Sequence, residues 1–146
     1  MNLRLGVPKE PENETRVGIV PSSMKKLLKA GFEVLVEKGA GVSANYSDAD
    51  YEAAGAKIVS RVDALACENI VCINFPGIEG ISENTNLACV ADPFRNPEYV
   101  KQCISSNITL MSMDMIPRRL SRAQSMDVNS SQDNLAGYKA VLLGAA

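Results

Sequence analysis

The segment Leu3–Val36, LRLGVPKEPENETRVGIVPSSMKKLLKAGFEVLV, decides the fold class of this chain. It opens with the apolar run Leu3–Val7, which predicts a strand. A proline and two serines at positions 21–23 then precede Met24–Ala30, and this pattern predicts the start of a helix, which the next glycine ends. A second apolar run, Phe32–Val36, predicts a second strand. A strand, a helix and a strand in this order typically form a right-handed unit of a parallel sheet.

The same alternation continues along the chain. Further helices are expected at Asp48–Ala54, Val62–Cys67 and Pro97–Ile104, and further strands at Lys57–Val59, Ile70–Phe75, Leu87–Ala91 and Ile108–Met113. Most of these strands look apolar enough to be buried on both faces, as in parallel sheets of α/β proteins. We therefore expect a three-layer α/β fold, Rossmann-like or flavodoxin-like, with any site at the carboxyl ends of its strands.

The last stretch, residues 121–146, is expected to form one long helix of about 39 Å. Ser121 and Gln124 would form a capping box at its start. Its second half, Leu135–Leu143, is apolar on too many sides for a solvent-exposed helix. We therefore expect residues 1–120 to form an α/β lobe, the long helix to lead to a second domain that is missing here, and its apolar surface to favour self-association.

The composition excludes several functional classes. The chain has 146 residues, of which 46% are hydrophobic and 22% charged, and its net charge is −2. Such a chain has no general electrostatic attraction for nucleic acid or anionic lipid. No apolar run approaches the roughly 18 residues of a membrane span. The start, MNLRLGVPKE, is too short and too charged for a signal peptide, so we expect a cytoplasmic protein.

The chain contains no histidine. This excludes a histidine general base, a Ser-His-Asp or Cys-His nucleophile and any His-ligated metal supplied by this chain, and no metal site is predicted. None of the four cysteines belongs to a C-x-x-C pair. Cys72, Cys89 and Cys103 lie in apolar surroundings and are interpreted as small buried hydrophobic residues.

Two early segments each allow two interpretations. Residues 39–44 fit G-x-G-x-x-A, a dinucleotide-binding pattern, but a polar loop follows them where an apolar helix should begin. We therefore favour a tight glycine turn there. In the charged loop after the first strand, Arg16 either clamps a carboxylate of a ligand or pairs with a glutamate of the same loop.

The loop 117–127 is the strongest candidate site. Arg118, Arg119 and Arg122 lie at the expected start of the long helix, where the helix macrodipole already carries about half a positive charge. Folding alone does not favour such a cluster, so an anionic or polar ligand is expected there. The polar run 129–134 inside the helix indicates a water-lined or ligand-facing surface, or a bend.

Several motifs resemble those of one family, the N-terminal lobe shared by alanine dehydrogenase and the NAD(P) transhydrogenase alpha subunit. The shared motifs are Val7-Pro8-Lys9-Glu10, Glu14-Thr15-Arg16-Val17, Gly31-Phe32-Glu33-Val34 and Glu37-Lys38-Gly39-Ala40-Gly41. The stretch Arg122-Ala123-Gln124-Ser125-Met126-Asp127, with Ser130-Ser131 and Ala136-Gly137-Tyr138, resembles the transhydrogenase specifically.

The resemblance implies the first lobe of the NAD(H)-binding domain of a proton-translocating NAD(P) transhydrogenase, inactive alone. NAD(H) would lie between this lobe and a second, Rossmann lobe, and NADP(H) would be bound by a partner subunit. The implied partners are that second lobe and the beta subunit with its NADP-binding domain. A homodimer, and association with the inner membrane through partner subunits, are expected as well.

The resemblance also implies roles for single residues. Gln124 would position the nicotinamide or a bound water, and Asp127 and Ser130 would bond the carboxamide or ribose side. Two of these residues, Gln124 and Asp127, are the expected catalytic residues. The expected cofactor-binding set is Arg118, Arg119, Ser121, Gln124, Asp127 and Ser130. Because the loop is one residue longer than is usual in the family, either Arg118 or Arg119 would be the arginine at the pyrophosphate or ribose, with Arg119 favoured by counting back from Asp127.

Two further functions stay open. Cys72 stands where the family usually has a lysine, which alanine dehydrogenases use together with a histidine. Their absence argues against an alanine dehydrogenase-like oxidoreductase. The other alternative is a non-catalytic module that binds another subunit.

Overall fold

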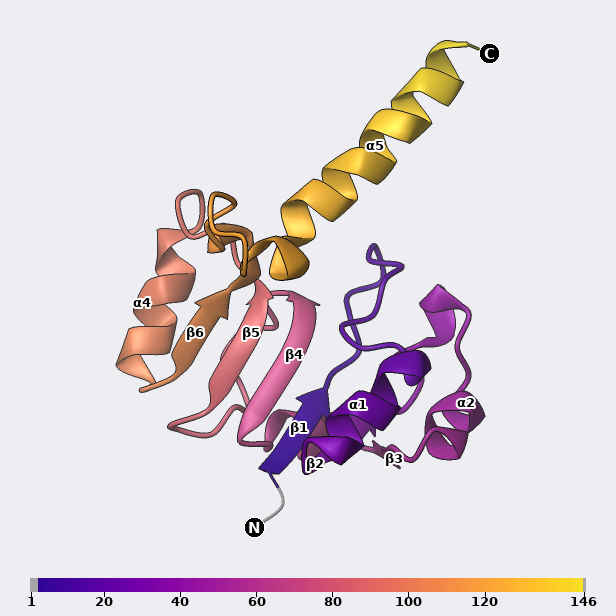
Figure 1. Cartoon of the computed structure of the whole chain (residues 1–146). Helices are drawn as coiled ribbons and strands as arrows, with labels where there is room; N and C mark the ends of the chain where they lie inside the picture. The colour runs from indigo at the N-terminus through magenta and orange to yellow at the C-terminus, as the bar shows by residue number, and fades with distance from the viewer. Residues whose placement is uncertain (1–2, 146) are drawn as a thin grey trace.

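The computed structural model describes residues 3–145 and contains a six-stranded sheet with the strand order β3-β2-β1-β4-β5-β6, in which all neighbours are parallel (Figure 1). The strands are β1 (Leu3–Val7), β2 (Phe32–Glu37), β3 (Lys57–Val59), β4 (Asn69–Asn74), β5 (Asn86–Val90) and β6 (Thr109–Ser112). The α-helices are α1 (Met24–Lys29), α2 (Asp48–Ala53), α3 (Arg61–Leu65), α4 (Pro97–Ser105) and α5 (Val128–Gly144). The predicted Rossmann-like α/β fold is confirmed, because the strand order reverses between β1 and β4.

Helices cover both faces of the half of the sheet that contains β1. On one face, Leu5 belongs to a buried cluster with Met24 of α1 and Tyr51 of α2. On the other face, Gly6 lies against α3, where an added Cβ atom would be 1.9 Å from the carbonyl oxygen of Ala64. Only a glycine therefore permits this close approach of α3 to the central strand.

The other half of the sheet is covered on one face. There, Ile70 and Leu87 pack with Leu65 of α3 and Cys103 of α4. The opposite face carries the partly exposed apolar side chains of β4 and β5, and no described helix packs on it: Val71, Ile73, Ala88 and Val90. The expectation that most strands are buried on both faces is wrong here: Val71 packs against the first cluster, but Ile73, Ala88 and Val90 border a cavity on this face.

Helix α5 begins at Val128 and extends away from the sheet (Figure 1). The expected start at Ser121 and the capping box with Gln124 are wrong. Residues 121–123 instead form a turn in which Ala123 is buried, and Gln124–Met126 form a short 3-10 helix. Asp127 is the residue that caps the helix, and its carboxylate accepts a hydrogen bond from the backbone N–H of Ser130 at 2.9 Å.

Within residues 3–145, no helix has both the length and the apolar character needed to cross a membrane.

Candidate functional site

A chain of polar contacts lies at the carboxyl ends of β1 and β4, where the strand order reverses. Glu10 follows β1 and is only 8% exposed. Its carboxylate accepts hydrogen bonds from the backbone N–H groups of Ile73 and Asn74, at 2.6 and 3.0 Å, and from the Asn74 side-chain amide at 3.1 Å. Such bonds satisfy a buried carboxylate and fix the loop after β1 to the end of β4.

The same loop holds Arg16 in a bidentate ion pair with Glu14. The guanidinium Nε donates to Oε1 at 2.8 Å and Nη2 donates to Oε2 at 2.7 Å. This hydrogen bonding lowers the pKa of Glu14 from 4.5 to about 2, although partial burial acts in the opposite direction. Of the two interpretations of Arg16, the structure therefore contains the pair with a glutamate of the same loop.

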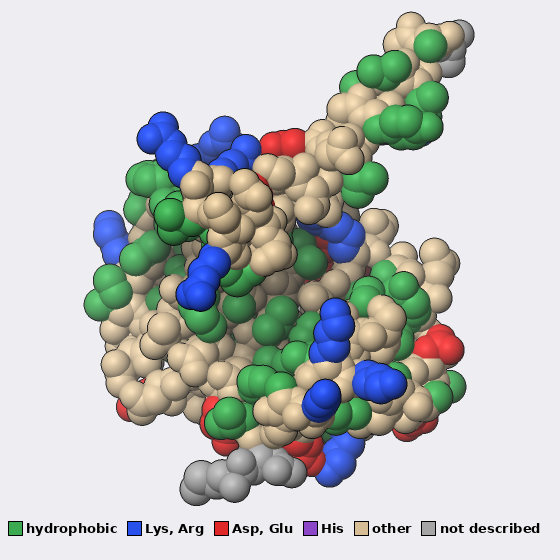
Figure 2. All heavy atoms as spheres, viewed as in Figure 1, with side chains coloured by type: hydrophobic (Ala, Val, Ile, Leu, Met, Phe, Trp, Pro, Cys, Tyr) green, Lys and Arg blue, Asp and Glu red, His purple; other side chains and the backbone are tan. Residues whose placement is uncertain are grey.

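Arg16 also contacts the long helix. Its Nη1 atom donates to Oε1 of Gln132 at 3.0 Å. Both residues border a cavity of about 740 Å³ between the uncovered face of the sheet and the base of α5. Figure 2 shows hydrophobic side chains in the hollow between α5 and α1. A volume of 740 Å³ is within the range of sites for small molecules and cofactors.

The base of α5 brings together three of the expected site residues. Asp127 Oδ2 accepts a hydrogen bond from the Ser130 hydroxyl at 2.6 Å, and Arg118 Nε lies 3.8 Å from Asp127 Oδ1. The pKa of Asp127 is lowered mainly by the bonds from Ser130 and also by the charge of Arg118. Arg118 approaches Asp133 as well, with Nη2 3.6 Å from Oδ2. Arg118 therefore has two carboxylate neighbours within this chain.

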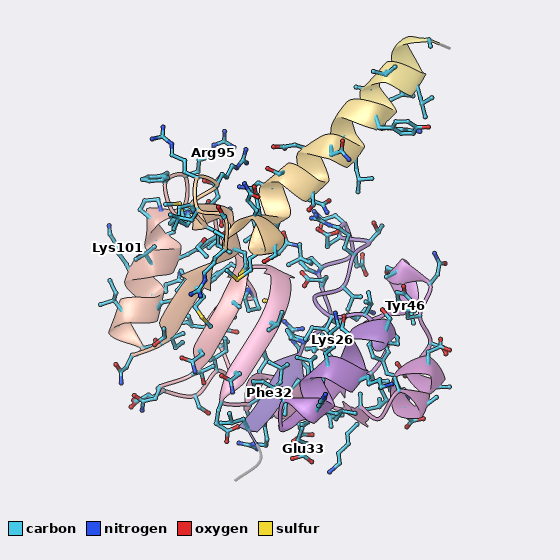
Figure 3. All side chains as sticks on the ribbon, in the orientation of Figure 1. Lys26, Phe32, Glu33, Tyr46, Arg95 and Lys101 are labelled. Atoms are coloured by element: carbon cyan, nitrogen blue, oxygen red, sulfur yellow. The ribbon has the colours of Figure 1, made fainter. Side chains whose placement is uncertain are left out.

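The other expected site residues lie exposed on the loop before α5: Arg119, Ser121 and Gln124. Within residues 3–145, their side chains form no hydrogen bond or salt bridge. Figure 2 shows Lys and Arg side chains gathered at this end of the molecule, and Figure 3 places Arg95 there, near the start of α4. The loop thus presents cations and polar groups to the surroundings, next to the Asp127–Ser130 pair.

The residue in the lysine position, Cys72, is buried. Its thiol interacts with that of Cys89, and this contact together with burial raises the pKa of Cys72. Such a thiol stays protonated and offers neither a cation nor a nucleophile at neutral pH. The interpretation of Cys72, Cys89 and Cys103 as buried hydrophobic residues is confirmed.

The glycine-rich segment 39–44 forms a tight turn. Gly39 has φ of 74°, and a short 3-10 helix, Val42–Ala44, follows it. An added Cβ atom at Gly41 would lie 2.6 Å from the ring of Tyr51. Gly41 is thus required by packing against an aromatic side chain, and the glycine-turn interpretation is confirmed.

Sequence reasoning did not identify the polar chain that joins Glu10, Asn74, Glu14, Arg16 and Gln132. Its contacts join residues that are far apart in sequence, such as Glu10 and Asn74 at a separation of 64 and Arg16 and Gln132 at a separation of 116. One signal was available, because Asn74 is a polar residue at the end of the apolar run of β4 and precedes a proline-glycine turn.

Comparison with known proteins assigns the fold to a family. Residues 6–136 match the family model described as "Alanine dehydrogenase/PNT, N-terminal domain". This chain belongs to that family. Family members similar to it include the NAD(P) transhydrogenase subunit alpha of Haemophilus influenzae, 37% identical over 97% of this chain, and an NAD(P) transhydrogenase alpha-subunit protein of Rhodospirillum rubrum, 42% identical over 98%. The chain spans 28% and 40% of their respective lengths.

Solved structures of the family agree with this assignment. A transhydrogenase from Sinorhizobium meliloti matches this chain with a TM-score of 0.90 and 38% identity. The match covers 95% of this chain and 43% of the transhydrogenase chain. An L-alanine dehydrogenase has a TM-score of 0.75 and 31% identity, with 83% of this chain and 34% of the dehydrogenase covered. Of these two structures, the transhydrogenase is therefore the more similar.

Proposed function

We propose that this chain is the first lobe of the NAD(H)-binding domain of an NAD(P) transhydrogenase, which transfers a hydride between NAD(H) and NADP(H). The observation that carries the proposal is the exposed loop 117–127 beside the Asp127–Ser130 pair, at the carboxyl end of the sheet. The transhydrogenase relatives support it, because they match nearly the whole chain.

The residues at this loop fit a dinucleotide. Arg119 and Arg122 are exposed and form no salt bridge within residues 3–145, so they can face a pyrophosphate. The carboxylate of Asp127 retains acceptor capacity beyond its two bonds from Ser130, and a carboxamide N–H group can use it. Gln124 offers an amide donor and acceptor for the nicotinamide or a water molecule.

Between the two candidate arginines, we propose Arg119 as the one that meets the cofactor. Arg118 is already engaged by Asp127 and Asp133, at 3.8 and 3.6 Å, whereas Arg119 has no ionic partner within the described part of the chain. Arg118 would then stay close to the carboxylate of Asp127, and Ser121, on the same exposed loop, would offer its hydroxyl to the cofactor.

Hydride transfer requires this lobe mainly to orient the bound cofactor. NAD(H), when bound, supplies or accepts the hydride, and hydride transfer needs close approach and alignment of the reacting groups. The lobe would hold the nicotinamide end through Gln124, Asp127 and Ser130 and exclude water there. No proton has to be transferred by this chain, which agrees with its lack of histidine.

The proposed identity brings proposed partners. A second lobe would complete the cofactor cleft, and a beta subunit with an NADP-binding domain would carry NADP(H) and place the complex at the inner membrane.

The apolar surface of α5 supports at least one protein contact, because Leu135, Tyr138 and Val141 are 61%, 69% and 71% exposed. A second copy of this chain is the simplest partner, and would give a homodimer. If the chain does not bind NAD(H) even with a second lobe, this surface favours a non-catalytic subunit-interaction module.

The test is an NADH fluorescence titration of this chain alone and of a chimera in which it replaces the matching region of the Rhodospirillum rubrum subunit. Alone, the chain should bind with a dissociation constant of about 1 mM or weaker, because half a cleft leaves most of the ligand in water. The chimera should bind clearly more tightly. Absence of NADH binding in a folded chimera would refute the proposal.

Variants of the chimera then test the loop. Arg119→Ala should weaken NADH binding by about tenfold or more, as expected for loss of a charged hydrogen bond. Lys101→Ala is the control, since Lys101 is an exposed cation on α4 that forms no salt bridge within residues 3–145, and it should change the affinity less than about twofold. A normal affinity for Arg119→Ala with a large loss for Arg118→Ala would reverse the assignment of the two arginines.

A further inference from the structure

Within residues 3–145, helix α5 contacts the rest of the chain only at its base. Of its 17 residues, only Val128 and Asn129 are partly buried, and all the others are exposed. Its direction relative to the sheet is therefore set by a small number of contacts in the first two turns. Any residue that makes one of these contacts influences where the far end of α5 lies.

Three polar contacts reach this base from other parts of the chain. The Asn129 side-chain amide donates to the carbonyl oxygen of Asp114 at 3.2 Å. Arg118, in the loop after β6, lies 3.6 Å from the carboxylate of Asp133. Arg16, in the loop after β1, donates a hydrogen bond of 3.0 Å to Gln132. These last two contacts border different cavities, of about 510 and 740 Å³. The two arginines therefore hold α5 from two flanks.

The contact from Arg16 is the better supported of the two. Arg118 is 52% exposed and its nearest carboxylate distances are 3.6 and 3.8 Å, which are long for direct hydrogen bonds. Arg16 is fixed by Glu14 through two short bonds, and Glu14 accepts a bond from the Asn74 amide at 3.3 Å. This places the Arg16 guanidinium in a defined position relative to β4 before it reaches α5.

We propose that Arg16 is a positioning residue that fixes the direction of α5 through its hydrogen bond to Gln132. The bond connects the reversal point of the sheet to the helix that carries Ser130 at its start. It would thereby hold α5, and whatever packs on its exposed half, in a set position relative to the Asp127–Ser130 pair. The fixing of α5 stands independently; only its consequence for cofactor binding rests on the proposed function.

Distance measurements between spin labels test the fixing of α5 in this chain itself. One label is placed at Lys101→Cys, on the outer side of α4 (Figure 3), and the other at Ala140→Cys on the exposed half of α5. The native cysteines are buried, and labelling of the parent chain checks that they do not react. Pulsed electron–electron double resonance then measures the distribution of distances between the two labels.

In samples diluted with unlabelled chain, so that only distances within one chain are measured, we expect one narrow distribution in the doubly labelled parent. Gln132→Ala should broaden it or shift its mean, and Gln132→Glu should restore it, since a carboxylate accepts the same bond from Arg16. Asn134→Ala is the matched control, because Asn134 lies on the same helix and its side chain forms no hydrogen bond within residues 3–145. An unchanged distribution in Gln132→Ala, or equal broadening in Asn134→Ala, would overturn the proposal.

The chimera adds a functional measurement. Gln132→Ala should weaken NADH binding by about threefold or more, and Gln132→Glu should recover most of the loss. A purely structural loss of folding would not be recovered by the carboxylate. If no chimera binds NADH, the proposed function fails, while the label distances still decide whether Arg16 fixes α5.

Discussion

At the scale of single residues, Glu14 makes the stability of the chain depend on pH. Its pKa is about 2 in the folded chain, against an ordinary value of 4.5, so the unfolded chain binds the proton first as the pH falls. The stabilisation is therefore fully present above pH 4.5 and is lost as the pH falls towards 2. Because Arg16 is 47% exposed, solvent screens the pair, and we expect a contribution of about 1 kcal/mol.

Urea unfolding of Glu14→Gln at several pH values measures this contribution. The variant should be less stable than the parent at pH 7, and the difference should shrink as the solution is acidified below the ordinary glutamate pKa of 4.5. Glu12→Gln is the matched control, since Glu12 is exposed and forms no salt bridge within residues 3–145. A difference that stays constant down to pH 2 would contradict the role assigned to the pair.

Gly6 is the second residue whose effect can be predicted. An alanine there would place a carbon atom 1.9 Å from a backbone oxygen of α3, so β1 and α3 would have to separate. We expect Gly6→Ala to destabilise the chain by about 3 kcal/mol or more, measured as a loss in the free energy of unfolding. Gly137→Ala is the control, because no atom lies within 4 Å of the added carbon; it should be neutral or stabilising.

At the scale of secondary-structure elements, α5 is the least supported part of the chain. Its residues beyond Asn129 are exposed, so tertiary packing adds little to the stability of its outer half. In the dilute, monomeric chain we expect the amide hydrogens of residues 135–144 to exchange with solvent faster than those of β1, β2 and β4, because only the hydrogen bonds of the helix itself protect them. Hydrogen exchange followed by mass spectrometry tests this, and slow exchange over residues 135–144 would indicate that α5 is covered in solution.

The elements also show what the sequence can and cannot predict. Strands β1 and β3 have the predicted bounds, because apolar runs between turn residues are a local signal. The predicted start of α5 is too early. Ser121 and Gln124 match a capping pattern, but residues 121–126 form a turn and a 3-10 helix, and Asp127 caps α5. The uncovered face of β4 and β5 is not predictable either, because an apolar run does not reveal whether anything packs on it.

For the candidate site, the sequence predicts the loop 117–127 but not its internal arrangement. The choice between Arg118 and Arg119 depends on contacts with Asp127 and Asp133 that only the folded chain defines. The bond between Arg16 and Gln132 joins residues 116 positions apart, and no local pattern predicts such a contact.

At the scale of the whole molecule, the exposed apolar residues of α5 should make the chain associate with itself. Leu135, Tyr138 and Leu142 are separated by three, four and seven positions and so share one face of the helix, where they are 61%, 69% and 50% exposed. Sedimentation velocity should show a concentration-dependent increase in size.

The double variant Leu135→Lys/Leu142→Lys should remain monomeric over the same concentration range, because it places two charges in the apolar face. Ala140→Lys is the matched control, since Ala140 lies on the opposite side of the helix, and it should associate like the parent. A parent chain that stays monomeric at high concentration would show that this face does not bind a second copy.

The attachment of α5 at one end makes it a mechanical lever. The helix has 17 residues and is therefore about 25 Å long. A tilt of about 10° at its base would displace its far end by about 4 Å, which is comparable to the separation of groups in direct contact. Gln132 lies about 6 Å from the start of the helix, so a displacement of about 1 Å there corresponds to about 4 Å at the far end. The polar contacts at the base of α5 would then determine the position of its far end.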